Sequence, residues 1–288
     1  MSRGEVLGLG ELVARRGFVS HGDPACVTAL LRSRSRAFAA RVEADRGSQG
    51  EDTDAGGASR RWIELGGTFA FDWGSYRCVH GFGDEGLRQL GALLEWFTSG
   101  PAPTFETYCG GMLATVAQAL ITLGYAPTHA HALYAGQLGA GEGGADEPRR
   151  DEALELSTDP ELFAWLGAQL WNAGDPTRAE ALARQHAGPG WTCVSALEGG
   201  RPVAAASMFF DGESAYLANA ITAPGSRGRG LHARLLQARI EHARACAKRW
   251  VVADTQVGSG SGRNLERAGL RCVATCLGWR PDAVLEGG

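Results

Sequence analysis

Three apolar segments follow one another in the second half of the chain, and only short turns separate them. The segments cover residues 191–197, 203–210 and 215–222, and the turns contain Gly199-Gly200 and Asp211-Gly212. Segments of seven or eight apolar residues match the length of β-strands, whereas most helices are longer. Gly-Gly and Asp-Gly pairs are typical of tight hairpin turns. The sequence therefore predicts three successive strands.

The rest of the chain alternates between segments of strand and of helix character. Strands are predicted near 67–72, near 76–80, near 104–109, after Tyr125, at 250–255 and at 271–279. Helices are predicted near 86–97, 112–122, 159–171, 176–186, 229–248 and 261–268. This alternation predicts an α/β (α+β) fold in which helices flank a mixed central sheet.

Two polar, glycine-rich segments indicate where the chain divides. Residues 44–60 are predicted to form a loop in the first half, and residues 136–152 to link two domains, 1–140 and 150–288. The two halves also show a weak internal similarity, because Gly124 and Gly269, 145 positions apart, each end a predicted helix. This similarity indicates either a duplicated fold or a coincidence, which is possible because glycine commonly terminates helices.

Charge is distributed unevenly along the chain. The net charge is −4, but residues 227–280 carry ten arginines and one lysine against three carboxylates. A positive segment on an acidic protein favours an anionic ligand over nonspecific nucleic-acid binding.

The cysteine pattern and the hydropathy indicate in which cellular compartment the protein is expected. The seven cysteines contain no C-x-x-C pair, which is typical of reduced thiols. No run approaches the ~20 apolar residues of a membrane span, and residues 1–20 lack a basic and apolar leader. We therefore expect a cytoplasmic protein without a membrane partner.

The first half contains a glycine pattern of the dinucleotide-binding type. Gly81, Gly83 and Gly86 spell G-x-G-x-x-G between a predicted strand and a predicted helix, and Glu106 follows at the distance of a ribose-binding acid. Asp84 and Glu85, however, would repel a diphosphate. A tight turn with a self-capped helix is therefore favoured, with a nucleotide-dependent oxidoreductase as the alternative.

A second glycine loop, residues 227–232, has the opposite charge. It reads Arg227-Gly228-Arg229-Gly230-Leu231-His232 and lies between a predicted strand and a long predicted helix. Glycines allow a ligand to approach the backbone, and the first N–H groups of a helix need acceptors. With two arginines and no acidic residue in the first turn, the loop is suited to a diphosphate. The alternative is a basic surface loop.

The same loop resembles the cofactor motif of the GNAT N-acetyltransferase superfamily, [RQ]-x-x-G-x-[GA]. Arg227 and Gly230 match the motif, whereas His232 replaces its last small residue. Downstream, "SGSGRNLERAGL" is similar to the family's S-x-x-N segment, through Ser261, Asn264, Gly269 and Leu270. Upstream, the three predicted strands resemble the family's three-strand meander. The resemblance covers about 150–280, and the first half resembles the degenerate partner domain of tandem GNAT proteins.

The resemblance implies acetyl-CoA as the co-substrate and no metal. Its diphosphate would bind the N–H groups from Gly228 to His232, and its pantetheine arm would pair with the backbone of strand residues at 220–222. The cofactor-binding residues implied in this way are Ala220, Ile221, Thr222, Arg227, Gly228, Arg229, Gly230, Leu231, His232, Ser261 and Asn264.

The groups that carry protons are less well defined by the sequence. Many relatives place a tyrosine shortly before the final glycine, but this chain has Leu265 in about that place. Asp254, at the end of a predicted strand, is the candidate general base, and the alternative is that it caps the turn that follows. Cys272 and Cys276 fit a core position better than a nucleophile, and no His/Cys/Asp group has the spacing of a zinc site.

The sequence thus predicts an enzyme that transfers an acetyl group from acetyl-CoA to the amine of a small molecule, within a possible homodimer. Besides the oxidoreductase that the Gly81 loop would serve, two alternatives remain open. One is a GNAT-fold transferase that takes its acyl group from aminoacyl-tRNA, although the acidic remainder of the chain counts against nucleic acid. The other is a non-catalytic protein that binds acyl-CoA.

Overall fold

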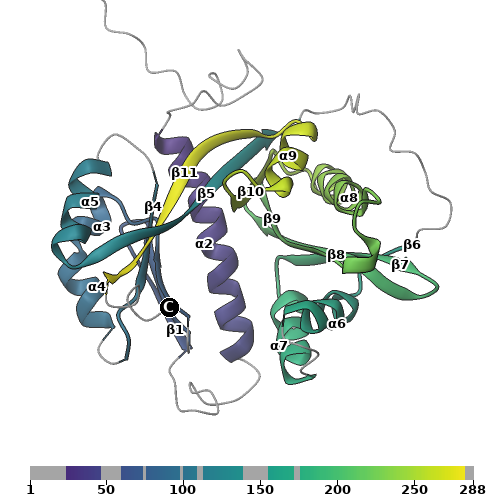
Figure 1. Cartoon of the computed structure of the whole chain (residues 1–288), viewed down its shortest axis with the longest axis horizontal. Coiled ribbons are helices and arrows are strands. Elements are labelled where there is room, and N and C mark those ends of the chain that lie inside the picture. Colours follow the sequence, from purple (N-terminus) through teal and green to yellow (C-terminus); the bar gives the residue numbers. More distant parts are fainter. Residues whose placement is uncertain are drawn as a thin grey trace, which may run out of the picture.

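The computed structural model describes residues 24–46, 60–73, 76–97, 100–108, 113–138, 155–171 and 176–282. In this part of the chain one 11-stranded sheet runs through the molecule in the order β1-β2-β3-β4-β11-β5-β10-β9-β8-β7-β6. Helices cover both faces of the sheet (Figure 1). The mixed α/β architecture predicted from the sequence is confirmed.

The elements of the first half are α2 (Pro24–Arg46), β1 (Arg60–Leu65), β2 (Thr68–Trp73), β3 (Tyr76–His80), α3 (Asp84–Arg88), α4 (Leu90–Trp96), β4 (Thr104–Tyr108), α5 (Leu113–Thr122) and β5 (Tyr125–Gln137). Those of the second half are β6 (Glu155–Ser157), α6 (Pro160–Trp171), α7 (Pro176–Ala187), β7 (Trp191–Glu198), β8 (Arg201–Asp211), β9 (Ser214–Thr222), the 3-10 helix η1 (Pro224–Ser226), α8 (Leu231–Ala245), β10 (Trp250–Gln256), α9 (Gly260–Arg267) and β11 (Arg271–Pro281). None of the described helices is long and apolar enough to cross a membrane.

The two halves follow the same succession of elements. In each half, three antiparallel strands lead through a glycine loop and helix to a strand parallel to the third: β4 runs parallel to β3, and β10 to β9. A repeated succession of this kind is expected of a duplicated fold.

The last strand of each half is exchanged with the other half. Strand β11 pairs with β4 of the first half, and β5 pairs with β10 of the second half, from Trp250↔Gln137 to Gln256↔His131. The strands β5 and β11 also pair with each other at the centre of the sheet. The halves therefore share a continuous sheet. Of the predicted linker 136–152, residues 136–137 form the end of β5, and residues 139–152 lie outside the described residues.

Helix α2 was not predicted from the sequence, yet it lies between the two halves (Figure 1). Its Ala37 packs with Trp191 and Tyr216 of the second half, whereas Val42 packs with Phe69 of the first half. The helix is rich in arginine and has little amphipathic contrast, so its apolar pattern is weak. It acts as a shared element of both hydrophobic cores.

Most other predicted elements are found close to their predicted positions. The meander is formed by β7, β8 and β9, and the long helix is α8. The helix predicted near 86–97 is divided into α3 and α4 at Gln89, and the short strands β1 and β6 were not predicted. The larger part of the predicted loop 44–60 lies outside the described residues.

Candidate functional site

The glycine loop at 227–232 leaves the backbone open at the start of α8. Gly228 and Gly230 have φ angles of +77° and +74°, a left-handed conformation that favours glycine. A Cβ atom at either position would meet no atom within 4 Å. No side chain caps α8, and its first turn holds no acidic residue. The first N–H groups of this 15-residue helix are therefore available to an anion, which the helix dipole also attracts.

The two arginines of the loop are held against the protein. Arg229 forms an ion pair with Glu198 at 2.5 Å, and the Arg227 Nε donates to the carbonyl of Thr222 at 3.4 Å. Both side chains are exposed, so they remain accessible to a ligand. Leu231, in contrast, is buried in the core, so only its backbone faces a ligand.

Beside the loop, strands β9 and β10 separate. Their parallel pairing ends at Tyr216↔Val252. Beyond this point β9 remains paired with β8, and β10 remains paired with β5. Strand β9 then bulges at Asn219, whose φ is +29°. From there to Thr222, β9 pairs only with β8, so its other edge faces the gap. The predicted pantetheine-binding residues Ala220, Ile221 and Thr222 lie on this edge.

A small cavity of about 50 Å³ occupies the gap between the strands and the two helices α8 and α9. It is lined by Leu217, Ala218, Asn219, Ala220, His232, Arg239, Ala253, Asp254, Ser261 and Leu265.

At this cavity the structure brings together the two motifs that resemble the GNAT family. The amide Nδ2 of Asn264 donates to His232 Nδ1 at 3.0 Å, and His232 Nε2 contacts Ser261 Oγ at 3.4 Å. Burial, and then the charge of Arg239, lower the pKa of His232. The imidazole is therefore neutral near pH 7, in agreement with its role as acceptor from Asn264.

Arg239 is a site residue that the sequence analysis missed. It is buried on α8, where its Nη1 donates to the carbonyls of Ser207 and Ala218 at 3.0 Å. Among the described residues no carboxylate forms an ion pair with it, and burial lowers its pKa to about 10. Its two acceptors, Ser207 and Ala218, are paired with each other directly beside the bulge at Asn219, so Arg239 fixes the carbonyls where the sheet ladder is interrupted.

A buried polar network connects the two halves on the other face of the sheet. Arg34 of α2 donates to both carboxylate oxygens of Glu106 and, from Nε, to Asp254 at 3.1 Å. Asp254 also accepts from the Tyr216 hydroxyl at 2.5 Å and from His131 Nδ1 at 2.9 Å. These five residues come from five different elements, and only Asp254 and Glu106 had been singled out from the sequence.

The network keeps its two carboxylates ionised. Burial alone would raise the pKa of Asp254, but the charge of Arg34 and the hydrogen bonds from His131 and Tyr216 hold it well below its ordinary value. The same balance of burial against Arg34 lowers the pKa of Glu106 to about 2. A carboxylate of such low pKa is a weak proton acceptor near pH 7. The turn after β10 is capped by Ser259, which accepts from the Gly262 N–H, and not by Asp254.

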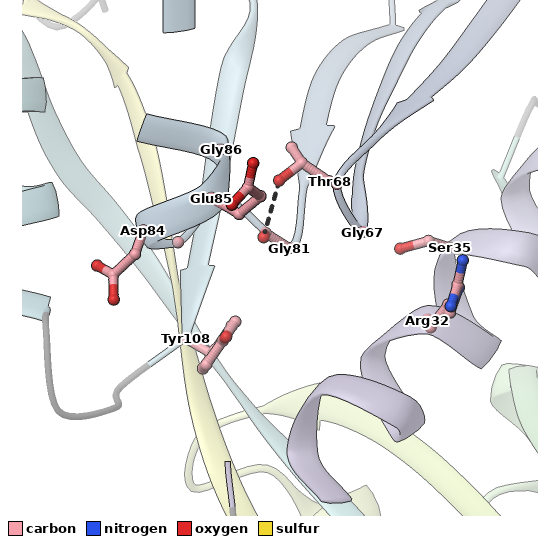
Figure 2. A pocket seen from close by; sticks show the side chains of 11 residues that line it. Arg32, Ser35, Gly67, Thr68, Gly81, Asp84, Glu85, Gly86 and Tyr108 are labelled. Carbon is pink, nitrogen blue, oxygen red and sulfur yellow. Dashed lines mark hydrogen bonds between the residues drawn. The ribbon is translucent and has the colours of Figure 1, made fainter. Parts of the chain in front are cut away.

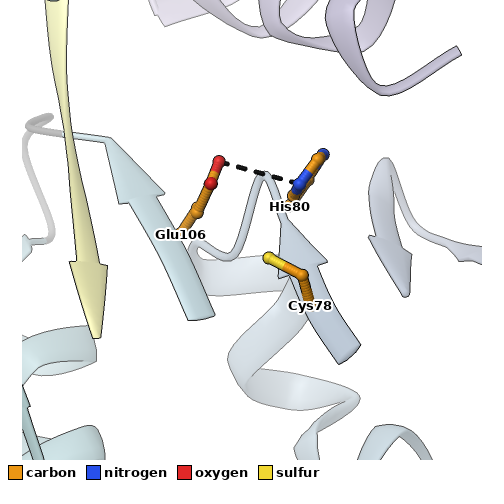
Figure 3. Close-up of side chains that lie close together, drawn as sticks. All are labelled: Cys78, His80 and Glu106. Carbon is orange, nitrogen blue, oxygen red and sulfur yellow. Dashed lines mark ion pairs between the residues drawn. The ribbon is translucent and has the colours of Figure 1, made fainter. Parts of the chain in front are cut away.

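Glu106 also belongs to a group of side chains that could hold a metal ion (Figure 3). In the described ranges, ligand atoms of Cys78, His80 and Glu106 lie within 4.8 Å of one another, because Cys78 and His80 share a face of β3 beside β4. Arg34 already binds both oxygens of Glu106, and its charge opposes a cation there. The absence of a metal stays a prediction.

The glycine loop of the first half lines a separate cavity of about 210 Å³, between α2, α3 and the β1–β2 turn (Figure 2). Gly83, and not Asp84, is the N-cap of the five-residue helix α3, and Asp84 and Glu85 occupy its first turn. Glu85 pairs with Arg88. A Cβ at Gly86 would lie 2.7 Å from Phe82 and Thr68, so this glycine serves close packing. The arrangement agrees with a turn and helix rather than with a diphosphate site.

Because two of its histidines are buried, we expect the protein to lose stability in mild acid. Burial, as the largest cause, lowers the pKa of His80 to about 4 and that of His186 to about 3. Because the pKa of each histidine is lower in the folded state than in the unfolded state, its contribution to stability is complete above about pH 6.5 and decreases as the pH falls.

Between pH 7.5 and pH 5, we expect the free energy of unfolding to decrease by roughly 2 kcal/mol for each histidine. Urea denaturation at the two pH values measures this, and His186→Gln should remove about half of the difference. An unchanged free energy of unfolding in the wild type would contradict the prediction.

The site thus combines an uncapped, acid-free helix start with a bulged strand that separates from its parallel neighbour. Residues 151–263 match the family model described as "Acetyltransferase (GNAT) family". This segment therefore belongs to the GNAT acetyltransferase family, whose reaction is acyl transfer.

Solved structures resemble this chain in fold over both of its halves. A GCN5-related N-acetyltransferase from Kribbella flavida has 16% identity and a TM-score of 0.58, and the match covers 90% of this chain and 96% of that one. A second, from Sphaerobacter thermophilus, has 16% identity and a TM-score of 0.55, with 88% and 92% covered. A tandem GNAT protein from the clavulanic acid biosynthesis pathway has 12% identity and a TM-score of 0.56, with 87% and 96% covered. At these identities the likeness concerns the fold. No curated protein matches the sequence.

Proposed function

We propose that this protein transfers an acetyl group from acetyl-CoA to the amine of a small molecule. The observation that carries the proposal is the open start of α8, where glycines at φ +77° and +74° expose helix N–H groups with no acidic side chain beside them. Backbone donors at a helix start bind diphosphates. The GNAT family membership of residues 151–263 supports acyl transfer as the reaction.

In this proposal the N–H groups from Gly228 to His232 hold the diphosphate, assisted by Arg227 and Arg229. The free edge of β9 at 220–222 pairs with the pantetheine arm, and Ser261 and Asn264 face it from α9. The thioester then lies in the gap, where the amine attacks its carbonyl carbon. Binding and orientation of the two reactants account for much of the rate in such a direct transfer.

Calorimetric titration with acetyl-CoA tests the proposal. We expect binding of one acetyl-CoA per chain, and no binding of NADH, because the loop at Gly81 carries Asp84 and Glu85 in its first turn. The absence of heat with acetyl-CoA would overturn the proposal, and tight binding of NADH would favour the oxidoreductase alternative.

Thiol release in the presence of primary amines then distinguishes an enzyme from a protein that only binds acyl-CoA. Leu265 takes the place where many relatives have a tyrosine. It is buried in the core and has no proton to donate, so another group must carry the proton.

A further inference from the structure

We propose that His131 and Asp254 form a catalytic dyad, in which Asp254 orients the imidazole and His131 Nε2 takes the proton from the attacking amine. The proposal deepens the proposed function and rests on it. It assigns the proton acceptor to a histidine of the first half of the chain, which the exchange of strand β5 places beside β10.

The contacts of Asp254 define the state of the imidazole. His131 Nδ1 lies 2.9 Å from Asp254 Oδ2, and an ionised carboxylate can only accept hydrogen bonds. The Nδ1 atom therefore carries the proton, which leaves the lone pair of the neutral ring on Nε2. Arg34 and Tyr216 hold the other carboxylate oxygen, so Asp254 is fixed from two further directions.

The dyad and the glycine loop lie on opposite faces of the sheet, with the gap between them. On β5, Leu133 shares a face with His131 and packs with Ala37 of α2, whereas Tyr134 faces the α8 side and packs with Leu236. Asp254 also lines the cavity in the gap. A thioester that enters from the α8 side would thus meet an amine that approaches from the α2 side.

The imidazole remains open to a ligand even though its carboxylate is buried. The His131 side chain is 34% exposed, whereas that of Asp254 is 9% exposed. An acceptor amine can therefore reach His131 without any change in the buried part of the network.

Charged and titratable side chains surround His131 on several elements. The charged groups of the network are Asp254 on β10, Glu106 on β4 and Arg34 on α2, so two carboxylates face one guanidinium. Other titratable groups beside it are His129, whose ring centroid lies 5.4 Å away, Cys276, which is opposite His131 on β11, and Tyr216, which bonds the same carboxylate.

The nitrogen of the amine forms the new bond to the carbonyl carbon, its proton passes to His131 Nε2, and the carbon–sulfur bond breaks. The thiolate of coenzyme A leaves and takes a proton from solvent, and the imidazolium later returns its proton to solvent. General-base assistance of this kind contributes about 10²–10⁴-fold to a rate.

Three variants test the dyad against acetyl-CoA and a panel of primary amines, with hydrolysis of acetyl-CoA by water as a second readout. We expect His131→Gln to lower kcat by about 10²–10⁴-fold and to leave the calorimetric affinity for acetyl-CoA unchanged. Asp254→Asn should lower kcat while KM for acetyl-CoA is unchanged, because it misdirects the imidazole. His129→Gln is the matched control, since its Nδ1 contacts the Thr128 hydroxyl at 3.0 Å and no carboxylate.

Rescue separates a chemical role from a structural one. The activity of His131→Gly should be partly restored by added imidazole, which a merely structural defect would not show. A kcat of His131→Gln within twofold of wild type overturns the dyad. The dyad is also overturned if the wild type binds acetyl-CoA but accelerates neither amine acetylation nor hydrolysis. In that case the assignment of the diphosphate site to the loop at 227–232 remains valid. A wild type that does not bind acetyl-CoA refutes the proposed function itself.

Discussion

Replacing Arg34 by methionine is expected to lower the free energy of unfolding by about 3–5 kcal/mol. Arg34 is buried on α2 and donates to Glu106 and Asp254, which face it from different halves of the chain. Methionine fills much of the volume of the arginine but leaves two buried carboxylates without a cation. Guanidinium denaturation, followed by circular dichroism, measures the loss.

Arg32 provides the matched control on the same helix. Its side chain is 46% exposed and pairs with Glu64, so Arg32→Met should change the free energy of unfolding by less than about 1 kcal/mol. Adding Glu106→Gln to Arg34→Met should recover part of the stability, because it removes one of the uncompensated charges. Equal losses in the two single variants would show that the network is not the source of the effect.

The position of Arg34 also explains how one helix can serve a duplicated fold. Glu106 and Asp254 lie on β4 and β10, the strands that run parallel to the third strand of each meander. The two carboxylates thus lie on corresponding strands of the two halves, and a single guanidinium between them binds both. The network is a property of the pair of halves and of neither half alone.

The sequence was informative wherever the signal is local. The meander at 191–222 and the loop at 227–232 were recognised because turn glycines, strand length and helix starts are encoded by neighbouring residues. The charge contrast between the two glycine loops also follows from adjacent residues, and the structure shows an uncapped helix start in one and acidic residues in the other.

Contacts between distant segments could not be predicted in the same way. His131 precedes Asp254 by 123 residues, and only the exchange of β5 and β11 brings them together. Nothing local to His131 distinguishes it from His129, two positions earlier on the same strand. Arg34 was missed because α2 itself was missed, as its arginines obscure the apolar pattern that packs against both cores. Arg239 carries a local signal, since it lies on the buried face of a helix, near Leu236 and Ile240.

Replacing Gly230 by tryptophan is expected to weaken the binding of acetyl-CoA by roughly 10²–10⁴-fold, equivalent to the loss of two charge-assisted hydrogen bonds. Gly230 is the N-cap of α8, and a side chain there would occupy the open space in front of the first helix N–H groups. The same space is where we place the diphosphate. Calorimetric titration of the variant with acetyl-CoA measures the change in affinity.

Gly212→Trp separates the effect on binding from the strain of a side chain at positive φ. Gly212 lies in the β8–β9 turn, also has a positive φ, +52°, and also faces open space. Its carbonyl accepts from Lys248, just beyond the last turn of α8, so it is remote from the helix start. Both variants should lose about 1–2 kcal/mol of stability, but only Gly230→Trp should lose affinity. If Gly230→Trp binds acetyl-CoA as tightly as the wild type, the helix start does not hold the diphosphate, and the coenzyme must bind elsewhere on the chain.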